Sequence, residues 1–328
     1  MPNVEGKLVY VIWSYGTLRD DQKERIEAAG PGAKYVYVAR DDVKIEDLKE
    51  ADVILGNPGC EKIKFCDKLQ FFRSQSAGVE NYCQPGILNP NVKFKNASGT
   101  FGPGISEYML SGVLTLARRW YQYRDLNKEH KWESAGKAVE IYRSTVLCLG
   151  TGDIGMEFAR KCKALGAYVI GVRRTLRSEK PDFIDEMYTS EQLADVVGRA
   201  DVIGMCMPDT PETRGTMCKK IFDNCKKGVL IVNAGRGRAI VTDDLMEALD
   251  NGVVGGCALD VTDPEPLPAD HKLWTYDNVL ITPHNTGGSD WFDQGVDVMI
   301  SDWAKYVNDE HLDFVDVKTG YKSTEKKD

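Results

Sequence analysis

The most informative spacing in this sequence is the glycine run Gly150-Thr-Gly152-Asp-Ile-Gly155, which follows the apolar segment Val146–Leu149. A helical pattern comes next, and a second strand-like segment follows at Tyr168–Val172. Glycines at these positions allow a tight turn, close approach of the backbone to a pyrophosphate and close packing of a helix on a sheet. The helix N-terminus would face the anion. The alternative is a glycine turn without a ligand, but the strand–helix–strand context favours a dinucleotide site.

The end of the second strand indicates which dinucleotide binds. It carries Arg173, Arg174 and Thr175, where an NAD site usually places Asp or Glu to bind the ribose hydroxyls. A carboxylate there would repel the 2′-phosphate of NADP, whereas guanidinium groups bind it in bidentate fashion. Two solvated surface arginines are the alternative, but both fall where the ribose should lie. We therefore predict NADP as the coenzyme, with NAD binding more weakly.

Three further residues follow successive strand-like segments downstream. Arg236 comes after Val229–Asn233, Glu265 after Cys257–Asp260, and His284 ends the run Val279–Thr282-Pro-His. All three are therefore expected at the carboxyl ends of parallel strands, where open α/β sheets hold ligands. Singly, each has a plain alternative: a structural loop arginine, a surface acid among prolines and a hydrogen-bonded structural histidine. Together they indicate a site.

The elements that position these residues form two series. Short β-rich runs alternate with helical patterns, which is typical of parallel sheets with crossover helices. Besides the segments above, strands are expected at Leu8–Trp13, Tyr35–Ala39, Val53–Leu55, Leu69–Arg73, Val92–Lys95, Thr145–Leu149 and Val202–Met207, and helices at Leu18–Ala29, Ile154–Ala164 and Leu245–Leu249. Two series in one chain predict an α/β fold with two doubly wound parallel-sheet domains.

The domain boundaries follow from two long helical patterns. Ile105–Tyr123, entered through the turn Gly99–Gly104, is expected to make the first crossing, and a helix near Trp291–Val307 to carry the chain back. We predict one domain from residues 1–100 plus 292–328 and the other from 101–291. The polar tail Lys318–Asp328 is expected to fray.

The totals exclude several classes of protein. A length of 328 residues fits two domains, and a net charge of -8 argues against a nucleic-acid partner. No apolar run is long enough to span a bilayer, and the start lacks a signal-peptide pattern, so we expect a cytoplasmic protein without a membrane partner. The 9 cysteines are odd in number and form no CxxC pair. Several, such as Cys148, Cys206 and Cys257, lie in apolar runs, so we expect reduced core thiols and no metal site.

At Arg236, Glu265 and His284 the sequence resembles the D-specific 2-hydroxyacid dehydrogenase family. This resemblance extends over nearly the whole length of the chain. Besides the glycine run, the resemblance rests on Met207-Pro-Asp-Thr-Pro-Glu-Thr-Arg214-Gly, Asn233–Gly237, Ala258-Leu-Asp260-Val and Pro283-His284. Ser76-Ala-Gly78-Val79-Glu-Asn resembles the family's substrate-carboxylate loop. The runs Tyr108–Arg124 and Val172–Arg174 look most like the glyoxylate/hydroxypyruvate-reductase-like branch, whose members often prefer NADPH. The family's fold implies a Rossmann dinucleotide-binding domain at 101–291 and a flavodoxin-like substrate domain in the remainder.

The resemblance also implies a reaction, in which a hydride passes from NADPH to the carbonyl carbon of a small 2-oxo acid such as glyoxylate or hydroxypyruvate. His284 would protonate the carbonyl oxygen as general acid, and Glu265 would orient the imidazole. Arg236 would bind the substrate carboxylate and stabilise the developing alkoxide. Backbone groups of Ala77, Gly78 and Val79 would hold the other side of the carboxylate.

The family's cofactor contacts transfer residue by residue, and Asp260 would orient the nicotinamide amide. The implied cofactor-binding residues are Gly150, Thr151, Gly152, Asp153, Ile154, Gly155, Arg173, Arg174, Thr175, Met207, Pro208, Thr213, Ala234, Gly235, Arg236, Asp260 and His284. A homodimer through Ile105–Tyr123 and its flanking loop is implied as well.

Some residues depart from the family pattern. The carboxylate loop reads Ser-Ala-Gly-Val-Glu, where the family more often has Gly-Ala-Gly-Val-Asp, and Asn285 and Thr286 follow His284 where it has Ser or Gly and then Ala. These changes could alter the size of the pocket. Trp132 and Trp291 are candidates to line that pocket or for ordinary packing. The remaining histidines, at positions 130, 271 and 311, are expected to face solvent.

Three rival functions share the fold. A formate dehydrogenase carries Gln where this chain has Glu265, and phosphoglycerate dehydrogenases often add a regulatory domain for which there is no room. The family's transcriptional corepressors act as dinucleotide-gated binding proteins. The acidic charge and the absence of appended interaction tails argue against that third function.

Overall fold

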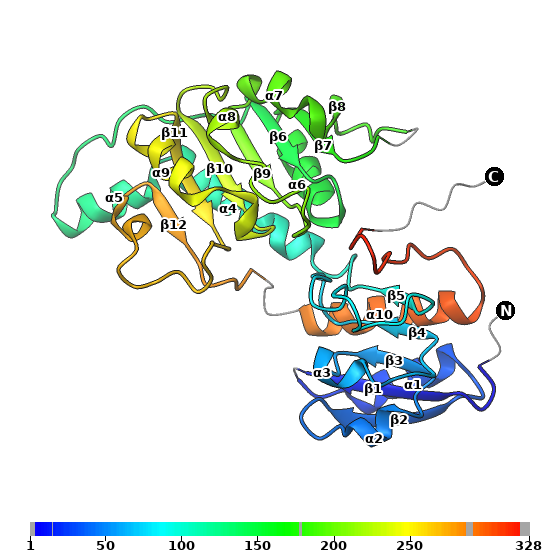
Figure 1. Ribbon diagram of the computed structural model, residues 1–328. Helices are drawn as coiled ribbons and strands as arrows, with labels where there is room; N and C mark the ends of the chain where they lie inside the picture. Colours follow the sequence, from blue (N-terminus) through cyan, green and yellow to red (C-terminus); the bar gives the residue numbers. More distant parts are fainter. Residues whose placement is uncertain (1–3, 15, 177–178, 287–290, 322–328) are drawn as a thin grey trace. The chain divides into compact units, whose positions relative to one another are not determined.

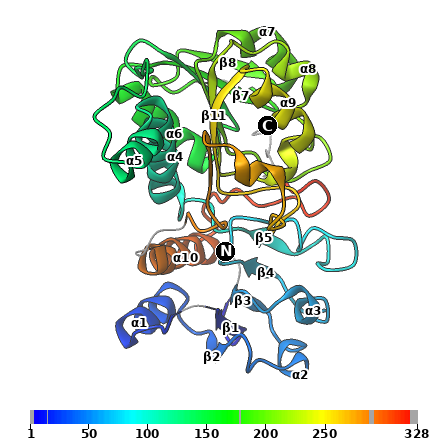
Figure 2. The same ribbon diagram turned by 90° about the vertical axis from the view of Figure 1, so that its left-hand side faces the viewer.

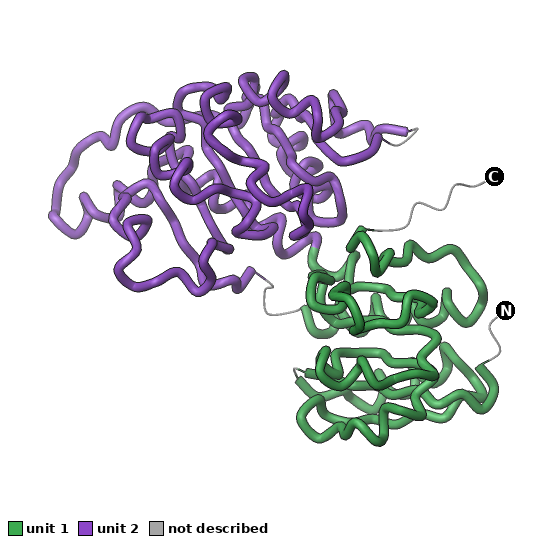
Figure 3. Tube along the Cα trace, in the orientation of Figure 1, with its two compact units in different colours: residues 1–101, 289–328 green, residues 102–288 purple. Residues whose placement is uncertain are grey.

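The structure is a computed structural model that describes residues 4–14, 16–176, 179–286 and 291–321 (Figure 1). The chain forms two compact units (Figure 3). Unit 1 comprises Met1–Phe101 and Ser289–Asp328, and unit 2 comprises Gly102–Gly288. Each unit is built around its own parallel sheet.

The sheet of unit 1 has five strands in the order β2-β1-β3-β4-β5, which is the flavodoxin-like order. They are β1 (Leu8–Trp13), β2 (Lys34–Ala39), β3 (Val53–Gly56), β4 (Phe71–Arg73) and β5 (Lys93–Lys95). Helices α1 (Asp20–Ala29) and α10 (Trp291–Val307) cover one face, and the short helices α2 (Ile45–Leu48) and α3 (Cys60–Ile63) lie on the other (Figure 2).

Strand β1 shows why the apolar runs of unit 1 are continuous rather than alternating. Val9 and Val11 pack into the cluster that contains Trp303 of α10, whereas Tyr10 and Ile12 pack into the cluster on the opposite face. Successive side chains of a strand point to opposite faces, so a strand covered on both sides must be apolar at every position.

The sheet of unit 2 has seven strands in the order β12-β11-β10-β9-β6-β7-β8. They are β6 (Thr145–Leu149), β7 (Tyr168–Arg173), β8 (Glu186–Thr189), β9 (Val202–Met205), β10 (Val229–Asn233), β11 (Val254–Leu259) and β12 (Val279–Ile281). The strands after β6 are added on one side of it as far as β8, and β9 then begins the other side, so the strand order reverses between β6 and β9. Open α/β sheets bind ligands at the carboxyl ends of the strands at such a switch point.

Helices cover both faces of this second sheet. α4 (Gly102–Ala117) and α6 (Asp153–Ala164) pack on one face, and α7 (Leu193–Val196), α8 (Lys219–Phe222) and α9 (Thr242–Asp250) pack on the other (Figure 2). The predicted α/β fold with two doubly wound parallel sheets is therefore confirmed.

One local prediction was wrong, and one strand was not predicted. The pattern Ile105–Tyr123 is not one helix: α4 ends at Ala117 and α5 (Trp120–Lys128) begins after Arg119, whose backbone has φ 57. A helix cannot continue through this left-handed conformation. The short strand β8 was missed, because its residues are half-buried at a sheet edge and form no apolar run.

Other side chains outside the sheets also have defined places. His130 and His311 are exposed as expected, but His271 is half-buried and its Nδ1 accepts a hydrogen bond from the amide of Leu273, 3.2 Å away. Trp132 is fully exposed, so within unit 2 it lines no pocket.

Among the described residues, no helix combines the length and apolar character needed to cross a bilayer. The final residues 322–328 of the predicted frayed tail lie outside the described chain.

Candidate active site

The glycine loop joins β6 to α6, and its three glycines have different local roles. Gly150 has φ +90, and a Cβ there would lie 2.9 Å from the carbonyl oxygen of Cys206. A Cβ on Gly155 would lie 1.9 Å from the carbonyl oxygen of Gly150, so the first turn of α6 packs directly on the loop. Gly152, by contrast, has nothing within 4 Å of its Cβ position. The loop is thus closed on its protein side and open at the helix N-terminus, where an anion would bind.

Substitutions at Gly155 and Gly152 should have different effects. Gly155→Ala should destabilise the protein by about 1–3 kcal/mol, because the new methyl group can be accommodated only by moving backbone. Gly152→Ala should leave stability nearly unchanged but weaken NADPH binding, because its methyl group would occupy the space left for the pyrophosphate. Urea unfolding and NADPH fluorescence titration of both variants measure the two effects. An equal loss of stability in both would contradict these roles.

A cavity of about 120 Å³ lies at the carboxyl end of β7. Its lining residues are Thr151, Met156, Arg173, Leu176, Glu179, Lys180, Pro181 and Met187. The buried hydroxyl of Thr151 has no hydrogen-bond partner within the described part of the chain. Buried polar atoms are nearly always paired, so a ligand in this cavity could satisfy it.

Of the two arginines predicted to bind the 2′-phosphate, only Arg173 lines this cavity; Arg174 and the predicted cofactor residue Thr175 are exposed. Lys180 adds a second cation, and its Nζ also donates to the carbonyl oxygen of Ile184. Sequence reasoning missed Lys180 because it lies beyond the strand end in a segment without a periodic pattern.

The loop after β10 is shaped by the fully buried Asn233. Its Oδ1 accepts from the amide of Gly235 at 3.0 Å, and its Nδ2 donates to the carbonyl oxygen of Arg236, also at 3.0 Å. Arg236 is half-buried, and its Nη1 donates to the Gly235 carbonyl oxygen at 2.7 Å. A Cβ on Gly237 would lie 1.9 Å from the carbonyl oxygen of Thr262, so this loop touches the loop after β11.

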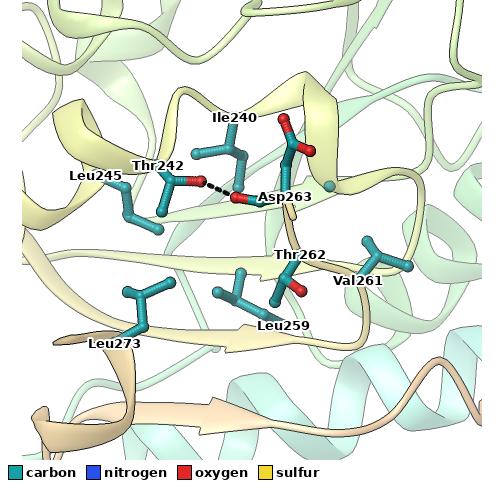
Figure 4. Close-up of a pocket in the computed structure, with 9 residues that line it drawn as sticks. Ile240, Thr242, Leu245, Leu259, Val261, Thr262, Asp263 and Leu273 are labelled. Carbon is teal, nitrogen blue, oxygen red and sulfur yellow. Dashed lines mark hydrogen bonds between the residues drawn. The ribbon is translucent and has the colours of Figure 1, made fainter. Parts of the chain in front are cut away.

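The loop after β11 carries Glu265. The hydroxyl of Thr242, at the start of α9, donates to the carbonyl oxygen of Asp263 at 2.8 Å and fixes the loop to the domain (Figure 4). Beneath it, Leu245, Leu259 and other residues line a cavity of about 10 Å³, which is too small for a substrate.

Glu265 meets His284, which follows β12. Glu265 Oε1 lies 2.6 Å from His284 Nδ1, and both side chains are about half-exposed. Since a carboxylate only accepts hydrogen bonds, Nδ1 carries the proton and Nε2 is left for a reacting group. Such an arrangement can orient an imidazole for proton transfer.

Ion pairs join the loops that carry Arg236 and Glu265. The sequence alone did not predict these ion pairs. Asp209 contacts Arg214 at 2.7 Å and Arg238 at 3.6 Å, and Arg238 lies 3.8 Å from Asp263. The amide of Gly215 donates to the carbonyl oxygen of Arg238 at 2.8 Å. The loops after β9, β10 and β11 are therefore tied together at the edge of the sheet where Arg236 and Glu265 lie.

The remaining predicted cofactor residues of unit 2 lie on the same edge. Thr213 donates its hydroxyl to the carbonyl oxygen of Pro208 at 2.6 Å and closes the loop that begins with Met207. Ala234 and the buried Asp260 directly follow β10 and β11.

The predicted carboxylate loop lies in unit 1, after β4. Asn96 Nδ2 donates to the carbonyl oxygen of Ala77 at 2.7 Å, Ser76 donates to that of Gly78 at 3.3 Å, and Val79 is buried. The loop is thus held by one of its own side chains, Ser76, and by Asn96, which follows β5.

Residues 110–286 match the family model described as "D-isomer specific 2-hydroxyacid dehydrogenase, NAD binding domain". The chain is 33% identical to glyoxylate/hydroxypyruvate reductase A of Serratia proteamaculans over 246 residues, 73% of this chain and 77% of that protein.

A second relative is longer than this chain. The chain is 27% identical to the D-3-phosphoglycerate dehydrogenase of Methanocaldococcus jannaschii over 295 residues, 88% of this chain but 56% of that protein. A solved NADPH-dependent glyoxylate/hydroxypyruvate reductase from Sinorhizobium meliloti, in complex with NADP and sulfate, superimposes with a TM-score of 0.79 and 28% identity, covering 96% of this chain and 100% of that one. The chain belongs to the D-isomer-specific 2-hydroxyacid dehydrogenase family.

Proposed function

We propose that this protein is an NADPH-linked reductase that converts small 2-oxo acids, such as glyoxylate or hydroxypyruvate, into D-2-hydroxy acids. The observation that best supports this function is the 2.6 Å contact between His284 Nδ1 and Glu265 Oε1, on the sheet edge that also bears the glycine loop. The fit to a dinucleotide is supported by the open position at Gly152, by the orphaned hydroxyl of Thr151 and by the cation Arg173 beside it.

Each residue of the site has a defined task in this proposal. NADPH, when bound, supplies the hydride. His284 delivers a proton from Nε2 to the substrate oxygen, while Glu265 holds the imidazole through Nδ1. Arg236 binds the substrate carboxylate and stabilises negative charge on the oxygen. Unit 1 acts as the substrate domain and contributes the backbone of Ala77–Val79.

Arg173 and Lys180 support NADPH over NADH, because both cations line the cavity at the end of β7. Glu179 also lines it, so a carboxylate is present near the proposed phosphate position. Two cations outweigh that carboxylate, and Arg173 lies directly at the strand end where the ribose binds in such folds.

We also propose a homodimer through α4, α5 and the loop after them. Leu114, Trp120 and Trp132 of this segment are exposed, and Trp132 is fully so. A contiguous exposed apolar patch marks a protein interface, and a homodimer through this segment would cover these three side chains.

A turnover assay tests the proposed function. NADPH oxidation is followed with glyoxylate, hydroxypyruvate, pyruvate and longer 2-oxo acids, and the product is analysed for chirality. We expect turnover with at least one short 2-oxo acid and a D-product. Tight NADPH binding without turnover of any of them would instead indicate a corepressor-like binding protein.

A further inference from the structure

A chain of side-chain hydrogen bonds runs from helix α4 to the turn that carries His284. Tyr108 Oη lies 2.7 Å from Thr282 Oγ1, and Thr282 Oγ1 donates to Asp260 Oδ1 at 2.6 Å. Because the single hydroxyl hydrogen of Thr282 is used on the carboxylate, Tyr108 must be the donor in the first bond. Burial raises the pKa of the Tyr108 hydroxyl, so this hydroxyl keeps its proton.

The turn at His284 needs such support. His284 has φ 50, in the left-handed region that costs about 1–3 kcal/mol and persists only where surrounding contacts enforce it. Asp260, only 2% exposed, supplies those contacts. Its backbone oxygen accepts from the amide of His284 at 2.9 Å, and its Oδ1 accepts from the amide of Asn285 at 3.0 Å. One buried residue therefore holds the chain at His284 and just after it.

Thr282 completes this arrangement from the other side. Its hydroxyl shares Oδ1 of Asp260 with the Asn285 amide, so rotation of the carboxylate would break both bonds. Tyr108 in turn fixes the Thr282 rotamer, and its ring packs beside the buried cluster under α4. Two hydroxyl groups on separate elements are thus linked through Asp260 to the turn that carries His284.

We propose that Tyr108 and Thr282 are positioning residues for the reaction. Their hydroxyls hold Asp260, and through it the left-handed turn at His284, in the arrangement that places the imidazole against Glu265. The proposal rests on the proposed function and adds to it two residues outside the expected set of substrate and cofactor contacts.

The effect on turnover should exceed the effect on stability. The neutral bond from Tyr108 contributes only about 1 kcal/mol to folding, and the bond from Thr282 to the Asp260 carboxylate about 1.5–3 kcal/mol, so loss of one hydroxyl leaves the protein folded. A misplacement of about 1 Å in a reacting group, by contrast, can cost about a hundredfold in rate.

The experiment uses matched variants of the full chain. Tyr108→Phe removes one hydroxyl and keeps the ring; Thr282→Val removes the hydroxyl at nearly constant shape; and Thr282→Ser restores it. The control is Tyr276→Phe, since the hydroxyl of Tyr276 bonds to Asp250 at 2.8 Å and this residue precedes β12, at the end of the strand away from His284.

We expect kcat for 2-oxo acid reduction to fall about tenfold in Tyr108→Phe and about tenfold to a hundredfold in Thr282→Val. The KM for the 2-oxo acid should change less than about twofold, because Arg236 lies on another loop, and Thr282→Ser should recover most of the rate. The double variant Tyr108→Phe/Thr282→Val should be no slower than Thr282→Val, since Tyr108 acts through Thr282. Tyr276→Phe should match the wild type.

A second readout does not depend on turnover. The imidazole NMR signals of His284, assigned by their loss in His284→Ala, should shift in Tyr108→Phe and Thr282→Val and stay unchanged in Tyr276→Phe. Unchanged signals in the first two variants would overturn the proposal, as would wild-type kcat in both or an equal loss in Thr282→Ser. A wild type that reduces no 2-oxo acid would instead refute the proposed function, and the NMR comparison would still decide the role of the two hydroxyls.

Discussion

His284→Ala is expected to lower kcat for 2-oxo acid reduction by about 10²–10⁴-fold, the usual cost of losing a positioned general acid. The reason lies in the geometry at Nδ1. Its proton is held by Glu265 at 2.6 Å, so Nε2 is the nitrogen that can deliver a proton to the substrate oxygen. Alanine leaves nothing to protonate that oxygen except solvent. NADPH affinity should change little, because the proposed site holds most of the dinucleotide at the glycine loop and at the end of β7.

Stopped-flow measurement of NADPH oxidation separates the chemical step from coenzyme binding and product release. His311→Ala is the matched control, because His311 also pairs with a carboxylate, Asp313 at 3.2 Å, but lies near the C-terminus in unit 1. Arg236→Ala should differ from both by raising the KM for the 2-oxo acid as well as lowering kcat. Near-normal turnover in His284→Ala would remove this residue from the mechanism.

Much of the fold could be predicted because it depends on local patterns. Strands covered on both faces are continuous apolar runs, so β1, β6 and β10 have the predicted bounds. The glycine loop could be predicted for the same reason, because the positive φ of Gly150 and the close approach at Gly155 exclude side chains at these positions. Arg236, Glu265 and His284 could be placed on one sheet edge because each follows a parallel strand.

The features that escaped prediction depend on contacts between distant segments. Nothing near Arg119 in the sequence signals the left-handed backbone that separates α4 from α5. Lys180 reaches the cavity at β7 through an irregular loop, and Tyr108 meets Thr282 across 174 positions of the chain. A single sequence carries no signal for such pairs, because side-chain polarity alone does not say which partners the topology brings together.

Coenzyme choice is the second large effect, and it should depend on Arg173. The 2′-phosphate is the only difference between NADPH and NADH, so any preference arises where that group binds. Hydrogen bonds to charged groups contribute about 1.5–3 kcal/mol, or about ten- to a hundredfold in affinity. We therefore expect the wild type to prefer NADPH by at least about tenfold in kcat/KM. Arg173→Asp should erase or reverse this preference, mainly through the KM for NADPH, because a carboxylate repels the phosphate and can bind the ribose hydroxyls of NADH.

Arg174→Asp is the matched control, since it makes the same change of charge one residue along the chain. Side chains alternate across a strand, and Arg173 lines the cavity at the end of β7 whereas Arg174 is exposed beside it. The control should therefore shift the NADPH-to-NADH ratio much less than Arg173→Asp does. Equal shifts in the two variants would mean that only the general positive charge of this edge matters. Equal use of both coenzymes by the wild type would mean that neither arginine binds the phosphate. A dominant effect of Arg173 would place the 2′-phosphate in the cavity that Thr151 and Lys180 also line, because all three side chains border the same space.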